Sequence, residues 1–127
     1  MAARNFSPIK ALEKNMVIIT GSFRPNGSST ISSTYNSTLG WSVARTSSGL
    51  FTVTLDDRYA ELVALHVSFA LVTAADLNPQ IGTVTVSMSA AGTFQIRALA
   101  GSTLTDIASN AANRVYFTAF LRNGQAV

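Results

Sequence analysis

The sequence predicts an all-β fold, an antiparallel β-sandwich or jelly-roll-like barrel of seven or eight strands. Two observations predict it. Short runs of alternating apolar and polar residues recur along the chain, separated by Pro, Asn and Gly turn residues, and no segment keeps a helical period beyond two turns. We expect one β domain over residues 16–127, preceded by an arm of residues 1–15.

The composition of the chain fits a single domain with little chemistry. A length of 127 residues allows one hydrophobic core without disulfides. Charged residues make up 12%, about half of the roughly 25% usual in soluble domains. The chain has no Cys, one His and six carboxylates. We therefore expect a non-enzymatic protein without metal or cofactor, whose surfaces rely on Ser and Thr or are covered by other subunits.

Residues 1–15 differ from the rest of the chain because they carry a cluster of charges and no alternation. A helical turn after Pro8 would be too short to be stable alone. We expect this arm to become ordered by docking on another surface. The N-terminus lacks the apolar run of a secretory signal, and the longest apolar stretch, 62–72, is too short to span a bilayer, so we expect no membrane partner.

The first half of the domain contains three predicted strands. Residues 16–23 form the first, with Val17, Ile19 and Phe23 on one face. A long polar loop over 24–38 follows, which leads into a hairpin of 41–45 and 51–55. The carboxylates after this hairpin predict one capped helical turn over 56–60.

Residues 61–73 show the cleanest alternation in the chain. The predicted core face consists of Val63, Leu65, Val67, Phe69 and Leu71. The opposite face is small and weakly polar, with Ala64, His66, Ser68 and Ala70 among its residues. Such a face is typical of a strand that another sheet or subunit approaches closely.

The second half of the domain ends in a strong strand. A turn over 74–80 precedes a second hairpin, 81–89 with 93–99. The polar connection 101–113 predicts a single helical turn capped by Thr105 or Asp106. The closing strand, 114–123, is apolar on both faces, which places it centrally in a sheet. Its second face carries Tyr116 and Phe120, which we assign to the oligomer interface with Ala64, His66, Ser68 and Ala70.

The candidate chemical sites each have a simpler structural explanation. His66 has no neighbouring motif for a triad or zinc site, so a structural or interface role is favoured. Asp56, Asp57 and Glu61 match no calcium loop. Tyr35 and Trp41 could form a glycan platform, although a core position for Trp41 is favoured. The nine basic residues are scattered, with no stripe for nucleic acid, which we exclude as a partner.

The order of segments resembles a known class of protein. The motifs are the basic arm Ala-Arg-Asn-Phe-Ser-Pro, a Val/Ile strand ending in Gly-Ser-Phe, Gly-Trp-Ser-Val-Ala-Arg-Thr, Gly-Leu-Phe-Thr-Val-Thr-Leu-Asp-Asp-Arg-Tyr, and the closing Asn-Arg-Val-Tyr-Phe-Thr-Ala-Phe-Leu-Arg-Asn. Together they resemble the small decoration, or cement, proteins of tailed-bacteriophage capsids. A head-fibre base, a tail component or a carbohydrate-binding module is the alternative.

The resemblance implies a mechanical function on the outer surface of a virion. Copies, commonly trimers in such proteins, would bridge subunits of the major capsid protein and resist the pressure of packaged DNA. It carries over no catalytic residues. The arm is the expected capsid contact, through Arg4, Phe6, Pro8, Ile9 and Lys10.

Overall fold

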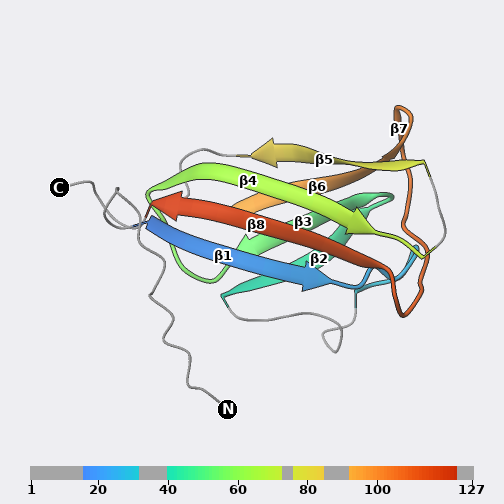
Figure 1. Ribbon diagram of the computed structural model, residues 1–127, viewed down its shortest axis with the longest axis horizontal. Coiled ribbons are helices and arrows are strands. Elements are labelled where there is room, and N and C mark those ends of the chain that lie inside the picture. The colour runs from blue at the N-terminus through green and yellow to red at the C-terminus, as the bar shows by residue number, and fades with distance from the viewer. Residues whose placement is uncertain (1–15, 32–39, 73–75, 85–91, 123–127) are drawn as a thin grey trace, which may run out of the picture.

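The chain forms two antiparallel β-sheets packed face to face, as predicted (Figure 1). The computed structural model describes residues 16–31, 40–72, 76–84 and 92–122, except for the side chains of residues 83 and 84. This part of the chain contains eight strands and no helix. The strands are β1 (Met16–Phe23), β2 (Trp41–Ser47), β3 (Leu50–Leu55), β4 (Glu61–Ala70), β5 (Leu77–Val84), β6 (Thr93–Ala100), β7 (Thr103–Leu104) and β8 (Arg114–Arg122).

One sheet has three strands in the order β1-β8-β4. The closing strand β8 lies between the other two, which confirms its predicted central position. β1 pairs with β8 in an unbroken register from Met16 opposite Arg122 to Phe23 opposite Val115. On the other side β8 pairs with β4, where the register shifts between Leu62 and Ala64.

The other sheet has the order β2-β3-β6-β5, with the two-residue strand β7 paired to β6. The β2–β3 hairpin is the one predicted from the sequence, with Val43 opposite Val53 across it. A two-residue turn, Ser48–Gly49, closes it, and Gly49 has the positive φ of 65° that favours glycine. Figure 1 shows β5 beside β4, so that on this side the edges of the two sheets approach each other.

The core lies between the sheets and is dominated by aromatic rings. Trp41 meets Phe117 edge to face with ring centroids 4.9 Å apart, and Phe94 meets Phe117 at 5.4 Å. Gly21 on β1 makes room for the indole, because a Cβ atom there would lie within 2.4 Å of the Trp41 ring. The other large, fully buried side chains are Phe23, Phe51, Ile96, Ile107, Leu121, Val53, Val115 and Pro25.

The faces of β4 differ from the prediction at one end. Leu65, Val67 and Phe69 pack against the core as predicted, but Val63 is 43% exposed. The register shift between Leu62 and Ala64 is the reason, because an extra residue in a strand reverses the parity of the residues before it. Leu62, which a regular alternation over 61–73 would put on the face opposite the core, therefore packs against the core in place of Val63.

Three predicted turns are also corrected. Residues Leu77–Gln80 belong to β5 rather than to a turn, because an edge strand tolerates the missing N–H of Pro79. No helical turn forms over 56–60 or after Thr105. Asp106 instead accepts hydrogen bonds from distant residues, as described below.

Candidate interaction surface

The outward side of the three-stranded sheet is the surface that the sequence analysis assigned to contacts. Along β8, Val115, Phe117, Ala119 and Leu121 are buried, so the residues between them point away from the core. We call this side the outer face. Its residues are Met16, Ile18, Thr20 and Ser22 of β1, Arg114, Tyr116, Thr118, Phe120 and Arg122 of β8, and Glu61, Ala64, His66, Ser68 and Ala70 of β4.

Tyr116 is the exposed large hydrophobic side chain of the outer face. It is 45% exposed and lies between Ser22 of β1 and Ser68 of β4. Because both neighbours are small, a hollow lies on each side of the ring. The hollow over Thr20 and Ser22 measures about 300 Å³ and the one over His66 and Ser68 about 250 Å³. The outer face therefore offers a raised aromatic ring between two depressions.

Charges occur only at the two ends of the outer face. Arg122 donates a hydrogen bond to the carboxylate of Glu61 at one end, in an ion pair. At the other end, Arg114 donates to the carbonyls of Ala111 and Asn113, each at 2.8 Å. The middle rows contain small, hydroxyl and aromatic side chains and the aliphatic Ile18, with His66 packed edge to face on Phe120 at 6.3 Å between centroids. A partner that covers the middle rows would therefore bury no carboxylate and no guanidinium group.

The structure places all six residues predicted for the oligomer interface on the outer face. The set is Ala64, His66, Ser68, Ala70, Tyr116 and Phe120. That another chain binds there stays a prediction. The contribution of β1 to the outer face was not predicted; it consists of Met16, Ile18, Thr20 and Ser22. The alternation of 16–23 gave the parity of these residues, but nothing in the sequence indicated that this strand pairs with β8.

The structure confirms the favoured core position of Trp41 and removes this residue from the alternative glycan platform. Trp41 is only 1% exposed, and both its ring and the Gly21 backbone belong to the core contact between the sheets. Its face is not available to stack on a sugar ring, so this half of the alternative is wrong. Tyr35 and the arm residues Arg4, Phe6, Pro8, Ile9 and Lys10 lie outside the described residues.

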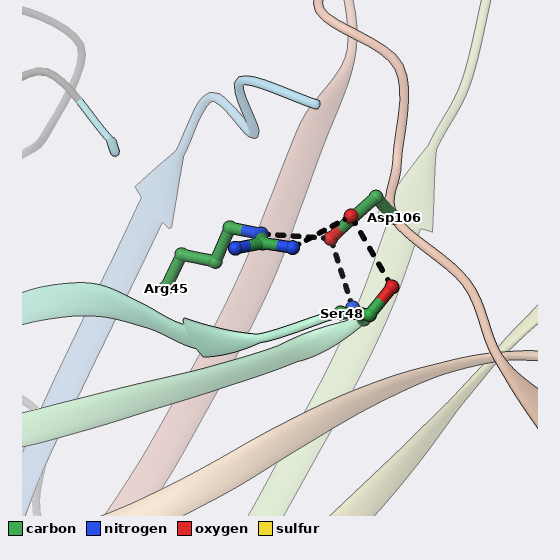
Figure 2. A network of polar contacts seen from close by, with 4 residues as sticks. Arg45, Ser48 and Asp106 are labelled. Atoms are coloured by element: carbon green, nitrogen blue, oxygen red, sulfur yellow. Dashed lines mark hydrogen bonds and ion pairs between the residues drawn. The ribbon is translucent and has the colours of Figure 1, made fainter. Parts of the chain in front are cut away.

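A network of polar contacts fixes the β2–β3 turn to the loop that follows β7 (Figure 2). The Arg45 guanidinium donates from Nε and Nη2 to the two carboxylate oxygens of Asp106, at 2.9 and 2.8 Å. The Gly49 N–H donates to Asp106 Oδ1 at 2.9 Å, and the Ser48 hydroxyl donates to Oδ2 at 3.3 Å. Both charged side chains are about four-fifths covered, with exposures of 20% and 19%.

This network changes the ionisation of both partners. Hydrogen bonding to Arg45 holds the pKa of Asp106 below its ordinary value, and the bonds from Gly49 and Ser48 act in the same direction against burial. The bond to Asp106 raises the pKa of Arg45 in turn. A carboxylate committed in this way to four donors is suited to holding two loops together rather than to proton transfer.

A cavity of about 390 Å³ opens at the same end of the sandwich, between the end of β4, the start of β5 and residues 105–113. The two amide side chains in its wall, Asn110 and Asn113, already form hydrogen bonds within the protein. Asn113 accepts from the Val72 N–H at 2.9 Å and donates to the Ala108 carbonyl at 3.0 Å. Asn110 accepts from the Ala112 N–H at 3.0 Å. These amides hold the loops that form the wall, and we assign the cavity no ligand.

Within the described ranges, no three His, Cys, Asp or Glu side chains gather where they could bind a metal ion. The same ranges contain no helix of the length and apolarity needed to cross a membrane. In comparisons with known proteins, no family model, no curated protein and no solved structure matches this chain.

Proposed function

We propose that this chain is a non-enzymatic structural protein of a virion, which associates with copies of itself through the outer face and bridges neighbouring capsid subunits. The virion role in this proposal is supported by the sequence motifs that resemble those of capsid decoration proteins. In this proposal the arm of residues 1–15 contacts the major capsid protein, and the sandwich is the body that spans the junction.

The observation that supports self-association is the composition of the outer face. Its middle rows combine Ile18, Phe120 and Ala64, then Thr20, Thr118 and His66, then Ser22, Tyr116 and Ser68. Interface cores in proteins are depleted of charge and enriched in aromatic residues, which matches these rows. Small side chains also let a second backbone approach closely.

The size of the outer face limits how strongly it can bind alone. Three strands at about 4.8 Å spacing and about 3.4 Å per residue along the nine residues of β8 give a footprint of about 440 Å². A stable interface of standard size buries about 800 Å² on each partner. The outer face therefore supplies roughly half of that area. A small interface of this kind suits a protein that binds a capsid through several weak contacts at once. The first contact raises the effective concentration for the next one.

Light scattering of purified Tyr116→Arg tests the role of the outer face. The wild type should have a mass that is a multiple of 13.4 kDa, and Tyr116→Arg, which puts a charge at the centre of the outer face, should lower the association constant at least tenfold. Thr54→Arg is the matched control, because Thr54 is exposed on the outward side of the five-stranded sheet. If only the control loses association, the other sheet is the interface and our assignment is wrong.

The virion role needs a separate experiment. The purified protein should cosediment with tailed-phage capsids prepared without decoration protein, and it should raise the temperature at which they release DNA. Binding to tail or fibre fractions instead would favour the tail or head-fibre alternative. A protein that binds neither fraction would remove the virion proposal while leaving the self-association result intact.

A further inference from the structure

Three of the four outermost strands in the described sheets carry features that discourage pairing with another chain. Proteins commonly protect exposed strand edges with charges, Pro, bulges or a covering element. β2 has Arg45 and a register shift after it. β5 has Pro79 and a register shift after Ile81. β4 begins with Glu61, has its own shift, and lies beside β5.

Within the part of the chain that the structure describes, β1 has none of these protections. Its eight residues, MVIITGSF, include no charge and no Pro, and they pair with β8 without a register shift. Figure 1 shows β1 at the border of its sheet, with β8 on one side only. Among the described residues, the backbone hydrogen bonds of β1 are those of its ladder with β8. Its run from Val17 to Thr20 is β-branched throughout, which favours an extended strand ready to accept a partner.

We propose that β1 pairs antiparallel with β1 of a second copy, which joins two three-stranded sheets into one sheet of six strands across a two-fold axis. This inference deepens the proposed self-association and rests on it. The partner is a second copy because two identical uncharged strands meet without repulsion. Pairing of the two β1 strands also makes the outer faces of both copies continuous. The joined face has about twice the area of one outer face, which alone supplies roughly half of a standard interface.

The pleat of β1 restricts the register of this pairing. Opposite residues in an antiparallel pair point to the same side, so outward residues must meet outward residues. The even-numbered residues of β1 point outward, so each must lie opposite another even-numbered residue of the second copy. The two residue numbers of every opposed pair therefore add up to an even number. The two-fold axis between the strands then passes through a residue position and not between two residues. Axes at Ile19 and at Thr20 give the longest pairings, with seven residues of each strand engaged. In both cases Thr20 lies at the seam on the outward side.

A two-fold contact makes the number of copies even. If β1 acts alone the protein is a dimer, and if it joins two trimers of the kind that the resemblance implies the protein has six copies. An isolated trimer would contradict the inference.

Single cysteines introduced into this Cys-free chain test the contact directly. Across the proposed seam, the Thr20→Cys side chains would lie about 5 Å apart if the axis passes Thr20 and about 7–8 Å apart if it passes Ile19. A bifunctional thiol reagent with a span of about 8 Å bridges either distance, so Thr20→Cys should give a covalent dimer on a denaturing gel. Thr20 is exposed, and the fold of the variant is checked by circular dichroism.

Ser68→Cys is the matched control, because Ser68 is an exposed residue on the far strand of the same outer face. In the six-stranded sheet the two Ser68 positions would be at least five strand spacings, about 24 Å, apart and out of reach of the reagent. A covalent dimer of Thr20→Cys alone supports the β1 seam. Equal crosslinking of both variants, or of Ser68→Cys alone, would favour face-to-face association, which keeps the proposed function and overturns the seam. Crosslinking of neither variant overturns the seam as well.

Discussion

Asp106 shows how a single carboxylate determines the conformation of one end of this sandwich. It lies 61 residues from Arg45 in the sequence, yet the two side chains form a bidentate ion pair. The same carboxylate accepts from the backbone of Gly49, at the turn where φ is positive. The Gly49 N–H at this turn needs a hydrogen-bond acceptor in a partly covered position, and the Asp106 carboxylate supplies it.

Asp106→Asn should therefore destabilise the fold by about 1 kcal/mol, which is below the roughly 1.5–3 kcal/mol usual for hydrogen bonds to a charged group, because the pair is partly solvated. The amide keeps the shape of the carboxylate but turns one acceptor into a donor facing Arg45. Urea unfolding at pH 7 measures the change. Asp76→Asn, an exposed aspartate at the cavity rim, is the control and should have little effect.

The pH dependence of the stability difference between the wild type and Asp106→Asn is a second test, and its direction is defined. The folded pKa of Asp106 lies below its ordinary 3.8, so the carboxylate stabilises the fold above that pH. As the pH falls through the folded value, both states bind the proton and the contribution is lost. The stability gap between wild type and Asp106→Asn should thus be constant from pH 5 to 7 and shrink below about pH 4. A gap that grows with acid would show that another group dominates.

The Asp106 network also marks a limit of sequence reasoning at the scale of residues. Thr105 and Asp106 follow a strand in a polar stretch, which is where helix caps occur, and a cap was predicted. The actual partners, Arg45 and Gly49, belong to a hairpin far away in the sequence. Local pattern cannot reveal a partner that only the packing of two sheets brings close.

At the scale of elements, the register shift in β4 is the feature that decides which side chains face the core. Alternation correctly predicted the strand and the inward Leu65, Val67 and Phe69. It failed at Leu62 and Val63, because both are apolar and a bulge leaves no signature in such a pair. Pro79 misled in a similar way, since Pro reads as a turn although an edge strand accommodates it.

Alanine substitutions at these neighbouring positions test the bulge. Leu62→Ala should cost about 1–3 kcal/mol of unfolding free energy, less than a fully buried leucine, because Leu62 is only partly buried against the core. Val63→Ala should stay within about 0.5 kcal/mol, because that side chain is 43% exposed. Chemical denaturation of both variants gives the comparison. A larger cost at Val63 would mean that β4 keeps a regular alternation without the bulge.

At the scale of the whole molecule, the sequence predicts strands better than sheets. The alternating runs and the paired hairpin identified most elements, and two of the buried aromatic residues, Phe23 and Trp41, were placed correctly. Which strands share a sheet did not follow, because the ladder between β1 and β8 joins the two ends of the described chain. The outer face was therefore predicted on β4 and β8 but not on β1. Interaction surfaces built by distant strands become visible only when the strand order is known.

The buried residues of the described core all lie between Ile19 and Leu121 in the sequence. Deletion of residues 2–14 removes no member of that core and no described strand, so the shortened protein should keep its circular dichroism spectrum and melt within a few degrees of the wild type. It should also keep its oligomeric mass, since the outer face and β1 begin at Met16.

Capsid binding should be the property that the deletion removes. The arm carries Arg4 and Lys10 beside Phe6, Pro8 and Ile9, a mixture suited to a segment that orders on a partner surface. Cosedimentation with undecorated capsids measures the loss, and a variant with only Arg4 and Lys10 changed to Ser separates the charge contribution through its salt dependence. A shortened protein that is folded, oligomeric and still binds capsids normally would move the capsid contact from the arm to the sandwich.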